Sequence, residues 1–395
     1  MRDHRLEVAE VFRQHEQEFQ RQWGHTLNAA RRRALCHIGA CRTAALGAHL
    51  EQCDNCPHQA IAYNSCRNRH CPKCQSSARD KWLAAQSAEL LPVPYFHLVF
   101  TLPGELSTLV LQNPRLLYGI LFRAVSETLL TIAADPRHLG ARLGFLAVLH
   151  TWNQRLSHHP HLHCLVPAGG LSWDRSRWVR CRRRFLLPVA VLRKMFRGKF
   201  LALLAAAFQQ HKLRLSGPLT KLEDPLAFDR FLGPLRSKSW VVYAKRPLGG
   251  PGPVIQYLAR YTHRVALSNG RLIEMRDGHV TFRWRDSTDG NQQKLMTLQA
   301  VEFMRRYLLH VLPPGFVKIR HFGYLANRNR REALADCRAL LASAADRPPD
   351  PLSDIRRRAV QRKCPSCQKG TLVILHWISA AALLVSRMSS FADTS

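Results

Sequence analysis

Residues 158–167, HHPHLHCLVP, place two histidines two positions apart within an apolar stretch. Side chains two apart on an extended strand point to the same face of a sheet. His161 and His163 would therefore lie side by side, while Leu162 faces the opposite layer. Many such pairs are purely structural, but two neutral imidazoles held this way can also bind a divalent metal ion and leave positions open. The stretch predicts a half-buried strand that carries a metal site on one face.

Two tyrosines follow about ninety residues downstream. Tyr257 and Tyr261 are four residues apart, so on a helix their phenols share one face. Tyrosine has a pKa near 10 and is only about 0.1% ionised at neutral pH, so a nucleophilic tyrosine needs a metal ion or a base nearby. The alternative is an aromatic stripe that packs on a sheet. Arg260 and Arg264 lie in the same segment and favour catalytic tyrosines beside the path of a phosphate backbone.

Cysteines are concentrated near the N-terminus, where seven of the twelve lie between Cys36 and Cys74. Cys53-x2-Cys56 and Cys71-x2-Cys74 are separated by fourteen residues, a spacing typical of one tetrahedral four-cysteine zinc site. Other potential ligands surround these pairs and could extend the site to a second ion or exchange with one of its ligands: Cys41, Cys66, His58 and His70, with Cys36. The pattern predicts a zinc-binding module in a reducing compartment.

Basic side chains accompany this cysteine block. Arg67, Arg69 and Lys73 lie among the cysteines and are predicted to contact DNA. The alternative is a purely structural zinc site. A lone Cys364-x2-Cys367 near the C-terminus is only half a site; it could recruit His376 or Cys337, or bind nothing.

The charge of the chain points to a polyanionic partner. Its 395 residues carry a net charge of +32, far above that of an ordinary enzyme of small metabolites. Lysine and arginine displace counterions from phosphates and supply non-specific affinity for nucleic acid. The N-terminus has no apolar signal core, and the most apolar run, residues 371–385, falls short of the roughly twenty residues that span a bilayer. We expect a cytoplasmic protein with no membrane partner.

Three segments in this order resemble the HUH-type two-tyrosine transposases of the insertion-sequence ninety-one family: residues 63–75, residues 96–103 with the histidine strand, and residues 257–269. The resemblance implies a metal-dependent endonuclease and strand transferase that nicks single-stranded DNA through 5′-phosphotyrosine intermediates in rolling-circle transposition. It implies Mg²⁺ or Mn²⁺ at His161 and His163, structural Zn²⁺ at the cysteines, and Tyr257 and Tyr261 as nucleophiles. The third ligand of the catalytic metal stays open; the candidates by position are Gln154, His159 and Gln256.

The resemblance also implies a fold and partners. We expect an α+β HUH endonuclease sandwich, an antiparallel sheet with helices, preceded by a small zinc-binding domain. The predicted domains are residues 1–90 (helical, zinc- and DNA-binding), 91–330 (catalytic) and 331–395 (a basic C-terminal tail). The partners would be single-stranded DNA at the element ends and target DNA. No GxxxxGK[ST] loop occurs in the sequence, so any helicase would come from the host.

Two other functions remain possible from the sequence. A plasmid replication initiator or relaxase shares the histidine pair and the tyrosine, but the zinc block ahead of them favours a transposase. A non-catalytic zinc-finger regulator of DNA would need neither tyrosine.

Overall fold

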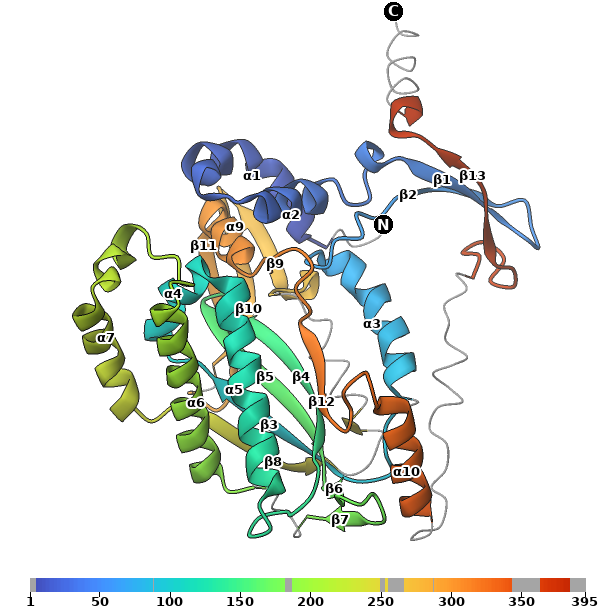
Figure 1. Cartoon of the computed structure of the whole chain (residues 1–395). Helices are drawn as coiled ribbons and strands as arrows, with labels where there is room; N and C mark the ends of the chain where they lie inside the picture. Colours follow the sequence, from blue (N-terminus) through green and yellow to red (C-terminus); the bar gives the residue numbers. More distant parts are fainter. Residues whose placement is uncertain are drawn as a thin grey trace, which may run out of the picture.

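The computed structural model describes residues 5–87, 89–181, 187–248, 253–254, 266–286, 288–342 and 363–383. A five-stranded antiparallel sheet in the order β12-β4-β5-β3-β8 forms its centre (Figure 1). Its strands are β3 (Tyr95–Thr101), β4 (Gly144–Trp152), β5 (His158–Pro167), β8 (Val242–Leu248) and β12 (Ile319–Gly323). The histidine strand β5 is therefore central, with β4 and β3 as its neighbours.

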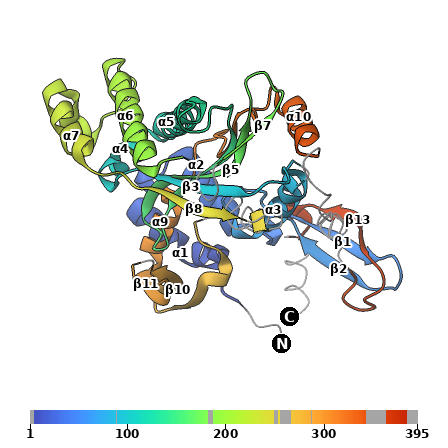
Figure 2. The same cartoon turned by 90° about the horizontal axis from the view of Figure 1, so that it is seen from below.

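One face of this sheet is apolar. Alternate residues of β3 and β5 point into it and are buried: Phe96, Leu98 and Phe100, with Leu162, Cys164 and Val166. Helices α5 (Pro114–Ala134), α6 (Val189–Gln209) and α7 (Pro225–Ser237) lie on this side of the sheet (Figure 2). Among the described helices, α5 alone is long and apolar enough to cross a membrane, but 67% of its most apolar window is buried. Its packing in the main hydrophobic cluster is that of a core helix.

The opposite face carries the histidines at one end and an apolar cluster at the other. Leu146 and Leu165 of the sheet pack there with buried residues of α3 (Pro72–Ser87) and α10 (Arg330–Ala342). Three short elements lie between the central strands along the sequence: α4 (Ser107–Gln112), β6 (Gly169–Leu171) and β7 (Trp178–Arg180).

The N-terminal helices share a core with a second sheet. That sheet has the order β11-β10-β9. The elements are α1 (Val8–Trp23), α2 (Ala29–Gly39), α9 (Ala300–Leu309), β9 (Leu272–Arg276), β10 (His279–Asp286) and β11 (Gln292–Gln299). Phe12 of α1 meets Tyr307 of α9 edge to face, with ring centroids 5.5 Å apart. The helices that begin the chain are thus packed on residues from its second half.

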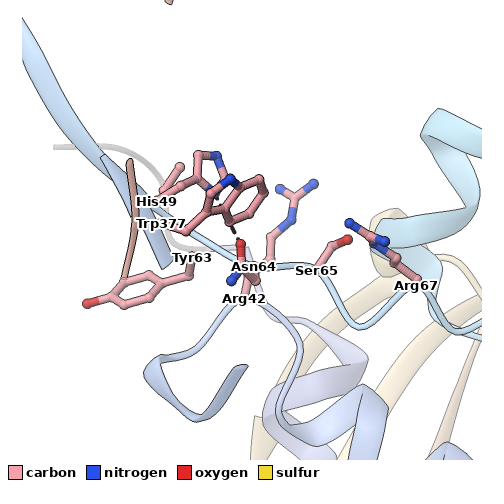
Figure 3. Close-up of a pocket in the computed structure, with 8 residues that line it drawn as sticks. Arg42, His49, Tyr63, Asn64, Ser65, Arg67 and Trp377 are labelled. Carbon is pink, nitrogen blue, oxygen red and sulfur yellow. Dashed lines mark hydrogen bonds between the residues drawn. The ribbon is translucent and has the colours of Figure 1, made fainter. Parts of the chain in front are cut away.

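A third sheet joins the two ends of the chain. Strands β1 (Ala48–Cys53), β2 (Gln59–Tyr63) and β13 (Leu372–Ile378) pair in the order β13-β1-β2. This sheet projects from the rest of the molecule (Figure 1), and a pocket opens beside it (Figure 3). Residues 331–395, predicted as a tail, therefore include an ordered strand that completes the N-terminal sheet.

The mixed architecture confirms the predicted α+β class, with an antiparallel sheet between helices. Apolar residues at three- and four-residue spacing predict a helix at residues 114–134, and α5 has those bounds. Residues 272–275 and 280–284, joined across Asp277-Gly278, predict a hairpin, which in the structure gains a third strand, β11. The strand predicted around His161 and His163, residues 161–167, begins earlier in the structure, at His158. Pro160 lies where the register between β4 and β5 shifts, and a proline is tolerated there because its missing N–H interrupts no regular ladder bond.

Candidate functional site

The central sheet brings three histidines together. His161 and His163 lie on the same face of β5, and His150 of β4 is the cross-strand partner of His161. One ring nitrogen of each lies within 4.8 Å of the others, which makes the group a candidate metal site. The apolar run at residues 145–152 predicts the strand that holds His150, but His150 was not among the predicted ligands. A histidine at the end of an otherwise apolar strand was the available signal.

The residues considered as a third ligand lie in different places. His159 takes part through its main chain, since its carbonyl accepts a hydrogen bond from His161 Nδ1 at 2.7 Å. The Gln154 carbonyl accepts a hydrogen bond from Arg271. Gln256 lies outside the described residues. His150 joins the pair because strand pairing, which residue spacing does not reveal, puts it opposite His161. A ligand role for Gln256 stays a prediction.

Hydrogen bonds orient the two rings of β5. With its Nδ1 proton donated to the His159 carbonyl, the Nε2 atom of His161 carries a lone pair. His163 Nδ1 lies 2.9 Å from His97 Nε2, so a proton on that Nδ1 leaves the His163 Nε2 lone pair free as well. The two Nε2 atoms are 3.1 Å apart. Two ligands at right angles about an ion roughly 2.1 Å away lie about 3 Å apart, so this separation fits cis ligands of one octahedral ion.

Burial keeps the imidazoles of His161 and His97 neutral. It lowers the pKa of His161 to about 4 and that of His97 to about 4, because a buried ring loses the hydration of its charged form. The charge of Lys245, on the neighbouring strand β8, adds to the effect at His97. Neutral imidazole is the form that binds metal ions, so near neutral pH the rings do not need to lose a proton first.

The predicted nucleophiles Tyr257 and Tyr261, with Arg260 and Arg264, lie outside the described residues. The described residues on either side both pack on the histidine face. Val254 is fully buried in the cluster that contains Leu165 of β5. Ala266 lines a small cavity with Trp152, whose ring stacks on His150 at a centroid distance of 4.6 Å. The described residue before this segment thus lies in the apolar cluster on the histidine face, and the one after it lies near His150.

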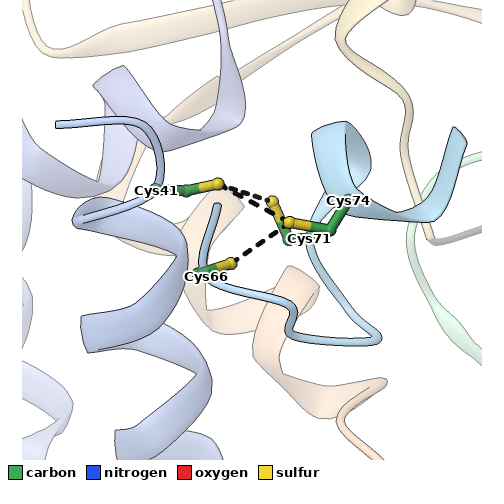
Figure 4. A group of neighbouring side chains, drawn as sticks. All are labelled: Cys41, Cys66, Cys71 and Cys74. Atoms are coloured by element: carbon green, nitrogen blue, oxygen red, sulfur yellow. Dashed lines mark hydrogen bonds between the residues drawn. The ribbon is translucent and has the colours of Figure 1, made fainter. Parts of the chain in front are cut away.

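The structure divides the four predicted zinc ligands between two clusters. Four sulfurs meet in the first, from Cys41, Cys66, Cys71 and Cys74 (Figure 4). The sulfur–sulfur distances are 3.7 Å for Cys41–Cys74 and 3.6 Å for Cys66–Cys74. Tetrahedral ligands about 2.3 Å from a zinc ion lie about 3.8 Å apart, so the cluster has the dimensions of a zinc site with four thiolate ligands. The prediction that Cys53 and Cys56 complete this site is wrong.

The second cluster joins Cys53 and Cys56 to Cys364 and Cys367. The sulfur–sulfur distances are 3.7 Å for both Cys53–Cys367 and Cys56–Cys364. The antiparallel pairing of β1 with β13 brings the two CxxC turns together, a tertiary contact that spacing along the chain does not reveal. The N–H of Gly370 donates to the Cys367 sulfur at 3.3 Å, and such backbone bonds lower the pKa of that thiol to about 6. The C-terminal pair recruits neither His376 nor Cys337.

The three basic residues of the cysteine block have different environments. Arg69 donates to the carbonyls of Phe316 and Pro313, and Lys73 forms an ion pair with Glu7. Both side chains therefore have partners within the protein, and their contacts with DNA stay a prediction. Arg67 is exposed on the surface.

Comparisons with known proteins identify the family. A model described as a transposase zinc-binding domain matches residues 11–102, and one described as a putative transposase matches residues 144–333. The putative transposase y4qJ of Sinorhizobium fredii is 51% identical over 379 residues, covering 93% of this chain and 94% of that protein. The transposase for insertion sequence element IS801 of Pseudomonas savastanoi pv. phaseolicola is 30% identical over 328 residues, 78% of this chain and 74% of that protein. The chain belongs to the IS91 family of transposases, with an N-terminal zinc-binding domain.

The candidate sites of this IS91-family transposase fall in different matched ranges. The three histidines lie within the transposase match, and the first cysteine cluster lies within the zinc-domain match. Cys364 and Cys367 lie beyond both. No solved structure shows a significant match to the chain.

Proposed function

We propose that this transposase nicks single-stranded DNA at the ends of its mobile element and transfers it to target DNA by a rolling-circle route, through 5′-phosphotyrosine intermediates. The observation that carries the proposal is the cluster of His150, His161 and His163 at the centre of the sheet. Burial lowers the pKa of His161, and hydrogen bonds orient the His161 and His163 rings as metal ligands require. A non-catalytic regulator would not need such a cluster.

The proposed reaction exchanges one phosphodiester for another. The phenol oxygen of Tyr257 or Tyr261 attacks the scissile phosphorus, the bond from phosphorus to the 3′ oxygen breaks, and the phenol loses its proton. The leaving oxygen takes up a proton and becomes a 3′-hydroxyl. Attack by a 3′-hydroxyl on the phosphotyrosine later reverses the step and joins two strands. Because one ester replaces another, the reaction needs no nucleotide cofactor.

The chain's own residues would perform the positioning. His150, His161 and His163 would hold Mg²⁺ or Mn²⁺, which as a Lewis acid draws charge from the scissile phosphate. The His159 carbonyl fixes the His161 ring, and His97 fixes that of His163. Tyr257 and Tyr261 would approach from the segment whose described ends pack on the same face of the sheet.

The net charge and the cysteine clusters indicate the partner of this transposase and the compartment in which it acts. The net charge of +32 supports binding along the phosphate backbone. Thiolate zinc sites persist in a reducing cytoplasm, where we infer that the protein acts. Strand separation would depend on a host helicase. A replication initiator or relaxase would share this chemistry, but membership of the transposase family favours transposition.

The test is covalent capture of DNA. Full-length protein is incubated with labelled single strands of the element ends, with Mn²⁺, with Mg²⁺ or with chelator, and resolved on a denaturing gel. We expect a metal-dependent adduct that protease, but not heat, removes. His161→Ala and the double variant His161→Ala/His163→Ala should form no adduct yet bind DNA almost normally, because affinity comes mainly from the basic surface. Adduct formation by the double variant would refute the assignment of the site.

A further inference from the structure

A pocket of about 610 Å³ lies beside the third sheet, away from the three histidines (Figure 3). Its lining comes from both ends of the chain, with Trp377 on β13, His49 on β1, and Arg42, Asn64 and Arg67 from the segments that flank the hairpin of β1 and β2. Nothing in the proposed cleavage reaction uses these residues.

Trp377 forms a fixed aromatic wall of this pocket. It lies opposite His49 across the β1–β13 pair, and the two ring centroids are 4.9 Å apart. His49 is held in turn by Asn64 Oδ1 and Glu51 Oε1, each 3.1 Å from a ring nitrogen. Trp377 nevertheless remains 62% exposed. The indole is therefore supported from one side and open to solvent elsewhere, which is the condition of a preformed stacking surface.

Arg42 and Arg67 supply positive charge next to the indole. Both are exposed, and both line the pocket with Trp377 (Figure 3). Their backbones adopt the left-handed conformation, with φ of 57° and 50°, and the Arg42 N–H donates to the Asn64 carbonyl at 3.0 Å. Within the described part of the chain, neither guanidinium has an acidic partner. Two unpaired arginines beside one open aromatic ring favour an anionic ligand with a planar group.

We propose that this pocket binds single-stranded DNA, with one unpaired base stacked on Trp377 and neighbouring phosphates on Arg42 and Arg67. The proposal rests on the proposed function in one respect, that the substrate is single-stranded. Base stacking on an aromatic ring is tolerant of sequence, and phosphate contacts anchor the strand. A second copy of this chain is a poorer occupant, because it would bring further arginines against Arg42 and Arg67.

The second cysteine cluster maintains the pocket. Strand β13 carries Trp377, and the described chain just before it contributes Cys364 and Cys367 to the cluster with Cys53 and Cys56. Loss of metal there would release β13 from β1 and remove the aromatic wall. Metal binding by the terminal CxxC pair and DNA binding by the pocket are thus coupled.

Fluorescence anisotropy with a labelled oligothymidine and zinc-loaded full-length protein, without added Mg²⁺ or Mn²⁺, tests the proposal. Trp377→Ala should weaken binding about tenfold, the loss of one stacked base, and Trp377→Phe should restore most of it. Trp173, 64% exposed and remote in the fold, gives the matched control: Trp173→Ala should bind as the parent does. Arg42→Ala and Arg67→Ala should each lower the slope of log affinity against log salt by about 0.7, whereas Trp377→Ala should leave that slope unchanged.

Several outcomes would overturn the pocket. One is binding by Trp377→Ala within twofold of the parent; another is an equal loss in Trp173→Ala. A third is a shift from dimer to monomer in Trp377→Ala with unchanged DNA affinity, which would assign the surface to a second copy. If Trp377→Ala loses zinc, the test rests on Arg42→Ala and Arg67→Ala. A slope of log affinity against log salt equal to that of the parent in both variants would then refute the proposal. Covalent adduct formation is scored separately, so a pocket that binds DNA in a protein that forms no adduct would refute only the proposed function.

Discussion

The sulfur of Cys53 lies 3.7 Å from the sulfur of Cys367, although 314 residues separate the two cysteines along the chain. The contact closes the chain on itself, because the strand that follows Cys367 pairs with the strand that ends at Cys53. A zinc ion there would tie the C-terminal segment to the N-terminal domain. The free energy of metal binding would then contribute directly to the stability of the third sheet.

The first prediction concerns zinc content. The two cysteine clusters predict two zinc ions per full-length chain. Cys364→Ser should lose one of them and Cys71→Ser the other, because a serine hydroxyl is a poor replacement for a thiolate. Cys36 is exposed and belongs to neither cluster, so Cys36→Ser should keep both ions. Elemental analysis of the purified proteins gives the answer, and two zinc ions in Cys364→Ser would exclude the second site.

Local features of the fold were predictable from local patterns. Alternation on β5 predicts the shared face of His161 and His163, and apolar spacing predicts α5. The zinc ligands were not predictable, because six of the cysteines occur as three CxxC pairs that could combine in several ways. Only the pairing of β1 with β13 decides that Cys53 and Cys56 meet the C-terminal pair, and strand pairing between distant segments leaves no trace in residue spacing.

The second prediction identifies the third metal ligand. His150→Ala should lower adduct formation at least about 100-fold at limiting metal, as removal of a direct ligand does. His159→Ala should have little effect, because His159 orients His161 through its carbonyl and not through its ring. The measurement is the rate of adduct formation against Mn²⁺ concentration. A larger loss in His159→Ala than in His150→Ala would reverse the assignment.

The third prediction assigns His97 a positioning role. His97 Nε2 lies 2.9 Å from His163 Nδ1 and can accept a hydrogen bond from it. With its proton on Nδ1, His163 presents the lone pair of Nε2 to the metal ion. His97→Leu should raise the Mn²⁺ concentration for half-maximal activity by about 10- to 100-fold, with the maximal rate largely recovered at high Mn²⁺. His97→Gln, whose amide oxygen can take the place of Nε2, should retain most of the affinity. Equal effects of both substitutions would mean that His97 only fills space.

The fourth prediction concerns pH. His310 is buried, donates from Nε2 to the Leu156 carbonyl at 3.1 Å, and receives a hydrogen bond from Thr151 at Nδ1. Burial lowers its pKa to about 4, whereas the unfolded chain should have a value near 6.5. Between these values the unfolded state binds a proton that the native state does not. The stabilising contribution is therefore complete above pH 6.5 and declines as the pH falls toward 4.

His310→Gln tests this linkage, because glutamine can replace the hydrogen bonds but does not titrate. The parent should be the more stable protein near pH 7.5, and its advantage should shrink by about 2 kcal/mol near pH 5. Urea unfolding of both proteins at several pH values measures the difference. An advantage that stays constant across this range would show that His310 does not titrate as its burial implies.

The last prediction separates the two tyrosines. Tyr257→Phe and Tyr261→Phe remove a hydroxyl and keep the ring, so a loss of activity reports chemistry more than packing. Each single variant should still form some adduct on a single-stranded substrate but should fail in transposition, which needs two linked cleavages. The double variant should form none.

Tyr243 gives the matched control, since it lies 55% exposed on β8 opposite Val99, on the histidine face of the same sheet. Tyr243→Phe should leave both activities intact. If Tyr243→Phe abolishes the adduct, the nucleophile is on β8. If one of the single variants transposes normally, that tyrosine only packs, and the transposase works with one nucleophile.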